Sequence, residues 1–263
     1  MALAAIATVA LYPVVILLLN ALKSKKEIEN NLLGLPSQYH FENFATAWQV
    51  GGYALAFRNS LVITLATVVG VVVISLLGAY SLARLNVRGA DGLMMYLIIA
   101  NTIPAQLFLV PLFFMWNALG LVNNPLGVIL IYWARFAPFH IFLLRSFFVG
   151  LSRDFEDAAR IDGASELQVL THVVVPLSRP AVMTSALIAG MTAWNEFLFA
   201  VIFLHGRPVQ TAPLRFVAFI GEYVDNWALT SAAGVLVVLP IVALFLLLQE
   251  RFIQGLAAGG LKG

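Results

Sequence analysis

Few residues in this chain are of types that do chemistry, and most of those stand inside long apolar runs. The histidines His40, His140, His172 and His205 are scattered, without the Glu-x-x-His or paired spacing of a metal site. No Gly-x-x-x-x-Gly-Lys-Ser/Thr loop is present, so nothing in the sequence cradles the phosphates of ATP. We expect no catalytic residue, no metal site and no cofactor held by this chain.

Arg135 and Glu196 are charged residues within apolar segments, where an ionised side chain is costly and usually functional. They stand at similar depths, which allows them to pair with each other; the alternative is that each side chain faces a water-filled cavity or snorkels separately. Hydroxyl-rich solutes need side chains that both donate and accept hydrogen bonds. The residues expected along a solute path are Asn101, Thr102, Gln106, Arg135, Trp194, Asn195 and Glu196. The alternatives are interhelical hydrogen bonding for the polar groups and an interfacial position for Trp194.

A polar stretch from Gly150 to Arg179 contrasts with its apolar surroundings. Asp154 is expected to cap a short helix that ends at Gly163, where glycine permits a left-handed backbone. Ser165 and Gln168 have the spacing of a capping box that opens a second helix, which Pro176 is expected to stop. The stretch therefore predicts an elbow of two helices joined at a glycine.

The residue types of this elbow favour insertion into a groove of a partner protein. Ala158 and Ala159 allow close backbone approach, and charged residues of both signs surround them: Glu156, Asp157, Arg160 and Asp162. The alternative is an amphipathic loop that lies on lipid headgroups, but interfacial helices favour Lys, Arg and bulky aromatic residues. The mixed charge and the small residues at the tip favour docking to a protein.

The whole composition indicates an integral membrane protein in which these residues are embedded. Apolar residues make up 61% of the 263 residues and charged residues 11%, whereas charged residues are about 25% of soluble domains. A formal net charge of +2 gives no sign of a nucleic-acid partner. We predict one all-α membrane domain over residues 1–263. Its six predicted spans are about 2–22, 59–83, 93–115, 126–149, 180–204 and 226–249.

The distribution of Lys and Arg orients these spans by a narrow margin. With both termini in the cytoplasm, the cytoplasmic side receives eight basic residues and the outer side six, while the lysines after the first span oppose this arrangement. The elbow at residues 150–179 then lies in the cytoplasm.

The elbow resembles the EAA loop of ABC importer permeases. Asp157-Ala158-Ala159 stands at the Glu-Ala-Ala position, Asp162-Gly163-Ala164 follows at the expected spacing, and Val173-Val174-Val175-Pro176 stands for Ile-x-Leu-Pro. The departures are Asp157 for Glu, with Glu156 beside it, and Val175 for Leu. Further similarity to the carbohydrate-uptake branch, in particular the second permease of maltose-type systems, is carried by Thr192–Phe197, Gly221-Glu222-Tyr223, Leu239-Pro240 and the tail at residues 254–263.

The resemblance implies a permease subunit with a type I ABC importer fold in a bacterial or archaeal cytoplasmic (inner) membrane. Its implied partners are a second homologous permease, an ATPase dimer that uses ATP and Mg, an extracytoplasmic substrate-binding protein and membrane lipid. The implied contact residues for the ATPase are Glu156, Asp157, Ala158, Ala159, Arg160, Asp162, Gly163, Ala164 and Pro176, with Gly255, Gly259 and Gly260 in the tail.

We expect a transport subunit that imports a sugar or oligosaccharide and is not itself an enzyme. The same architecture would serve for glycerol phosphate, a polyamine or a peptide, although a strongly anionic solute would call for more arginines than Arg135. A self-sufficient secondary transporter or a membrane enzyme remains a further alternative.

Overall fold

The computed structural model of the chain describes the backbone of residues 2–260 and the side chains of residues 6–247 and 249. Within the described backbone every regular element is a helix, which confirms the predicted all-α fold class. The chain divides into two compact units, Met1–Leu61 with His205–Phe245, and Val62–Leu204 with Leu246–Gly263. The helices α4 (Tyr53–Arg84) and α14 (Trp227–Gly260) each contribute residues to both units.

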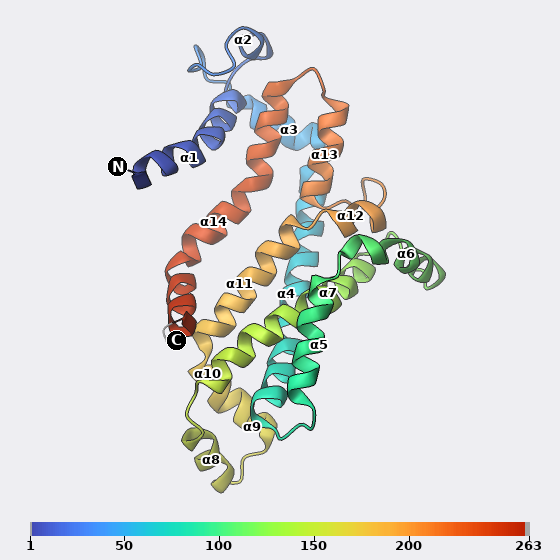
Figure 1. The fold of residues 1–263 in the computed structure, drawn as a ribbon. Helices are drawn as coiled ribbons and strands as arrows, with labels where there is room; N and C mark the ends of the chain where they lie inside the picture. The colour runs from blue at the N-terminus through green and yellow to red at the C-terminus, as the bar shows by residue number, and fades with distance from the viewer. Residues whose placement is uncertain (1, 261–263) are drawn as a thin grey trace. The chain divides into compact units, whose positions relative to one another are not determined.

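In the first unit, hydrogen bonds from a buried polar side chain connect short helices and the segments between them. It contains α1 (Ala2–Ala21), α2 (Lys25–Asn30), α3 (Glu42–Gly51) and α13 (Ala212–Glu222), which Figure 1 draws in blue and orange. Lys23 follows α1 and is fully buried. Its ammonium group donates to Asn20 Oδ1 at 3.0 Å and to the carbonyl oxygens of Asn31 and Leu32 at 2.7 and 3.2 Å. These acceptors compensate a buried charge that would otherwise be costly.

The second unit has α7 (Pro125–Val149) at its centre, between α5 (Ala90–Thr102) and α11 (Arg179–Asn195) (Figure 1). Asn124 caps α7 and Pro125 occupies its first turn, where a missing N–H costs nothing. The remaining helices of this unit are η1 (Ala105–Phe108), α6 (Leu109–Ala118), α8 (Asp154–Ile161), α9 (Glu166–Val169), η2 (Leu170–Val174), α10 (Val175–Leu177) and α12 (Leu198–Phe203).

Among the described residues, three helices are long and apolar enough to cross a membrane: Tyr53–Arg84, Pro125–Val149 and Trp227–Leu247. Up to five spans result if each of two bent helix pairs counts as one, and Ile6–Ala21 is a shorter apolar helix. The predicted number of six spans stays a prediction.

Two of the predicted spans are broken. The predicted span 93–115 divides into α5 and the pair η1 and α6, with a bend of 89°. The break falls at Pro104, which has no N–H to donate and restricts Ile103 to an extended conformation. The predicted span 180–204 ends its first helix at Asn195 and restarts as α12 after Glu196. A proline within a span favours a break such as the one at Pro104, whereas no proline or glycine marks the break at Glu196.

The polar stretch folds as the predicted helix–glycine–helix elbow, with two corrections. Gly163 has φ +85°, and Ser165 and Gln168 form the predicted capping box. Asp154, however, is the first helical residue rather than the cap, and its N–H donates to the Ser152 hydroxyl at 3.3 Å. Pro176 does not stop the helix, because it lies in the first turn of α10, where its missing N–H is tolerated. The chain turns beyond Leu177, by 86° into α11.

An apolar cluster holds the second arm of the elbow, formed by α9, η2 and α10, in the second unit. Val169, Leu170 and Val174 are buried against Leu144 and Phe148 of α7, together with residues of α4 and α11. η2 is a π-helix, a rare form that often marks functional sites. The elbow is thus an integral part of the second unit.

Candidate functional site: a polar cavity and a charged elbow

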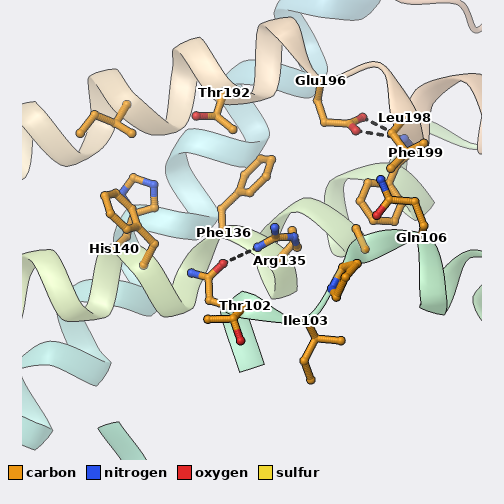
Figure 2. A pocket seen from close by; sticks show the side chains of 15 residues that line it. Thr102, Ile103, Gln106, Arg135, Phe136, His140, Thr192, Glu196, Leu198 and Phe199 are labelled. Atoms are coloured by element: carbon orange, nitrogen blue, oxygen red, sulfur yellow. Dashed lines mark hydrogen bonds between the residues drawn. The ribbon is translucent and has the colours of Figure 1, made fainter. Parts of the chain in front are cut away.

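The breaks in the two predicted spans 93–115 and 180–204 border a cavity of about 600 Å³. Its wall comes from the end of α5 and the Pro104 break, from α7, and from the end of α11 with the start of α12 (Figure 2). This volume lies within the usual range of roughly 300–1,000 Å³ for small-molecule sites. Backbone that leaves the helical ladder within a membrane protein is expected where it lines such a cavity.

Arg135 is half-buried in the cavity wall and points toward the end of α5 (Figure 2). Its Nη1 donates to Asn101 Oδ1 at 2.5 Å. No ion pair joins Arg135 to any carboxylate among the residues with described side chains. A guanidinium group has five donors, and the hydrogen bond to Asn101 uses one of them.

Glu196 also borders the cavity, but its carboxylate is held by neighbouring donors. Tyr132 donates its hydroxyl to Glu196 Oε2 at 2.6 Å, and the N–H groups of Phe199 and Ala200 donate to the same carboxylate at 3.0 and 3.2 Å. Glu196 therefore accepts from two of the free N–H groups in the first turn of α12, where a negative charge is also favourable. The pairing of Glu196 with Arg135 that the sequence left open is wrong, because the two charges have separate partners (Figure 2).

The cavity brings together five of the residues expected along the path: Asn101, Thr102, Gln106, Arg135 and Glu196. Trp194 is buried and Asn195 is exposed, and neither borders the cavity. Asn195 instead donates to the carbonyl oxygen of Met191 at 2.9 Å.

Sequence reasoning missed several residues that border the cavity, among them Phe136, Phe139 and His140 of α7 and Thr192 of α11. Helical spacing could have found Phe139, because it lies one turn from Arg135 and therefore on the same face of α7. His140 Nδ1 lies 2.8 Å from Ser185 Oγ, so this buried ring has a polar partner.

In the elbow, Arg160 is the centre of a charged network. Its Nη1 lies 2.8 Å from Asp157 Oδ1 and its Nε lies 2.8 Å from Glu166 Oε1. Hydrogen bonds to Glu166 and then Asp157 raise the pKa of Arg160. These bonds connect α8 to the first residue of α9 across the glycine turn.

The tip of the elbow presents a shallow hollow of about 340 Å³. Ala159, Asp162, Gly163 and Ala164 border it from one arm and the turn, and Gln168, His172 and Val173 border it from the other arm. A Cβ at Gly163 would meet no heavy atom within 4 Å, so glycine serves there for its backbone conformation.

Residues 70–257 match the family described as "Binding-protein-dependent transport system inner membrane component". The chain belongs to this family. As a member of this permease family it is a transport component of a membrane, with several spans, and not an enzyme. The resemblance to carbohydrate-uptake ABC permeases found in the sequence is confirmed.

Relatives of this permease cover nearly its whole length. The probable ABC transporter permease protein YurM of Bacillus subtilis is 34% identical over 96% of the chain and 84% of its own length. The sulfoquinovosyl glycerol permease SmoH of Agrobacterium fabrum is 35% identical, with 96% and 89% covered. The melibiose/raffinose/stachyose import permease MelC of Bacillus subtilis is also 35% identical, with 95% and 91% covered.

The permease also resembles chains of known structure. A chain of a bacterial ABC transporter that imports the acidic polysaccharide alginate has a TM-score of 0.81 and 27% identity, covering 95% of this chain and 93% of its own. A chain of an alginate transporter in complex with a pentasaccharide-bound periplasmic protein has a TM-score of 0.68 and 15% identity, with 90% and 86% covered, and supports the fold.

Proposed function

We propose that this chain is a permease subunit of an ATP-driven importer that passes a sugar or oligosaccharide through the cavity of its second unit. The observation that carries the proposal is the cavity itself, because broken helices place polar and aromatic side chains around it. Such a mixture suits saccharides, whose hydroxyls need hydrogen bonds and whose ring faces pack on apolar surfaces. The saccharides named for MelC and for the arabinooligosaccharide permease AraQ support the same class.

The other components are those that the permease family implies. A second related permease would complete the path, and an ATPase dimer would bind and hydrolyse ATP with Mg. An extracytoplasmic binding protein would deliver the solute, as the family description and the periplasmic protein in the alginate complex support. Both termini and the elbow would lie in the cytoplasm.

The elbow would couple this permease to the ATPases. Its hollow is bordered by the small residues Ala159, Gly163 and Ala164, and the Asp157–Arg160 ion pair belongs to the same elbow, which fits docking to a partner protein. The proposed contact residues remain those expected from the sequence. The proposed contacts of Gly255, Gly259 and Gly260 lie outside the residues whose side chains and surroundings are described.

Purification of the tagged chain from its host tests this function directly. Mass spectrometry is expected to identify a second permease and an ATPase, and the complex in liposomes is expected to take up a labelled oligosaccharide only with ATP and the binding protein. ATP-independent uptake by this chain alone would favour a secondary transporter instead.

An acidic saccharide of low charge is a second candidate solute, because the one arginine of the cavity, Arg135, has no carboxylate partner among the residues with described side chains. The Glu196 carboxylate is compensated by three donors, whereas the Arg135 guanidinium bonds only a neutral amide among the described partners. The alginate importer of similar fold is described as acting on an acidic polysaccharide. Uptake of the labelled oligosaccharide is measured in the presence of an unlabelled uronate oligosaccharide or of its neutral analogue. If the natural solute is acidic, only the uronate oligosaccharide reduces this uptake.

A further inference from the structure

The first helix of the elbow has one buried side chain, beside the partly buried Ala159, which packs against the apolar cluster of the second unit. Of the eight residues of α8, only Glu156 is buried, with 2% of its side chain exposed. The other seven residues are exposed or half-buried. A helix normally attaches through apolar residues, so a carboxylate in this position needs a specific partner.

That partner is Arg84, the last residue of α4. Its Nε lies 2.8 Å from Glu156 Oε1, and its side chain is 3% exposed. Neither of these two atoms has an aligned hydrogen bond, so this contact is mainly an attraction between charges. Nη2 of Arg84 also donates to the carbonyl oxygen of Leu151 at 2.9 Å, in the segment that leads into α8.

One turn earlier in α4, Tyr80 contacts the second arm of the elbow. The Tyr80 hydroxyl donates a hydrogen bond to Glu166, the first residue of α9. Arg160 bonds the same carboxylate and approaches Glu156 Oε2 at 3.4 Å. The last turn of α4 therefore contacts both arms of the elbow, although 86 residues separate Tyr80 from Glu166.

We propose that Arg84 and Tyr80 form a clamp that makes the elbow and the C-terminal turn of α4 move as one body. The chain enters α8 through a short segment and leaves the elbow through the bend before α11, so the covalent connections alone would let α8 pivot. The clamp removes that freedom, and a force on the elbow reaches α4 directly. The role of the clamp in coupling rests on the proposed docking of the elbow to an ATPase.

A distance measurement within this chain tests the clamp. The chain has no cysteine, so two can be introduced, Leu85→Cys directly after α4 and Phe155→Cys in α8, and both positions are exposed. Spin labels on this pair in the assembled complex report the distance by dipolar EPR. With the native clamp, the distance distribution is expected to stay narrow and unchanged when ATP and vanadate trap the ATPases.

Arg84→Met is expected to keep basal ATP hydrolysis. It is also expected to broaden the distribution of distances between the two spin labels, and to make that distance shift when ATP and vanadate trap the ATPases. Because the single change leaves Glu156 buried without its partner, the double change Arg84→Met/Glu156→Met provides a variant with no uncompensated charge. It is expected to assemble normally and still lose the fixed distance. Asp91→Asn is the matched control, because it removes the exposed partner of Arg145 in the same unit.

Two results would overturn the clamp. One is a distance that shifts on trapping in the otherwise native chain, and the other is a native-like distribution in both methionine variants. If no ATPase co-purifies with the native chain, the proposed function fails instead. In that case, the distance between the two spin labels, measured in the chain alone in detergent, still tests whether Arg84 fixes the position of α8.

Discussion

Gly70 of α4 is a residue whose lack of a side chain is structurally required. A Cβ at this position would lie 2.0 Å from Cε2 of Trp133, whose Nε1 donates to the Ala66 carbonyl oxygen at 3.0 Å. Gly70→Ala must displace the indole ring and is expected to destabilise the protein by about 1–3 kcal/mol, as overpacking usually does. Thermal unfolding in detergent measures this, with Gly92→Ala as the control, since a Cβ there meets nothing within 4 Å. Equal stability of the two variants would contradict the close packing.

The separate partners of Arg135 and Glu196 lead to a prediction about their energetic coupling. Side chains in direct contact usually couple by about 0.5–3 kcal/mol, and separate partners weaken such coupling. The effects of Arg135→Gln and Glu196→Gln on the unfolding free energy are therefore expected to be closer to additive than those of the contacting pair Tyr132 and Glu196. Tyr132→Phe with Glu196→Gln is the positive control and is expected to be non-additive, because those side chains are 2.6 Å apart. Strong coupling between Arg135 and Glu196 would restore the pairing that the structure contradicts.

At the scale of the element, α13 is stabilised by a charge cluster that responds to acid. Glu222 accepts from Nη2 of the buried Arg215 at 2.7 Å and from Arg207 at 2.9 Å. Hydrogen bonds from Arg215 and then Arg207 lower the pKa of Glu222 from 4.5 to about 2. Since the folded-state pKa is below the unfolded one, the stabilisation is fully present above about pH 4.5 and is lost as the pH falls toward 2.

Glu222→Gln is therefore expected to lower the unfolding temperature at pH 7, and the difference from the native chain is expected to shrink between pH 4.5 and pH 3. Unfolding temperatures measured across this range give the result. Glu29→Gln, an exposed position of the same unit, is the control. A difference that does not vary with pH would mean that the carboxylate is not held by the two arginines.

The elements that the sequence predicts well are those fixed by local patterns. Long apolar windows located α4, α7 and α14, and the capping box at Ser165 was visible from residue types and spacing alone. The break at Glu196 was not visible, because no proline or glycine marks it and the donor that fixes Glu196 is Tyr132 on α7. The pairing of Arg84 with Glu156 was likewise hidden, because only the packing of α4 brings these residues together.

At the scale of the whole molecule, coupling would depend on the backbone at Gly163, where the elbow reverses. Its φ of +85° lies in a region that a residue with a Cβ adopts at a cost of roughly 1–2 kcal/mol, asparagine excepted. Because there is open space around this position, conformation rather than a clash decides the outcome. Gly163→Asn is expected to keep saccharide-stimulated ATP hydrolysis in the assembled complex, and Gly163→Val is expected to lose most of it while basal hydrolysis persists.

The two variants occupy one site and differ in how well they accept a left-handed backbone, so each is the control for the other. The ratio of stimulated to basal hydrolysis is the measurement, and co-purification of the ATPase confirms that the complex has assembled. If Gly163→Asn and Gly163→Val lower the ratio of stimulated to basal hydrolysis equally, the surface of the tip matters more for coupling than its backbone conformation. If neither uncouples, the elbow does not transmit the motion, and the proposed route from the ATPases to the cavity is wrong.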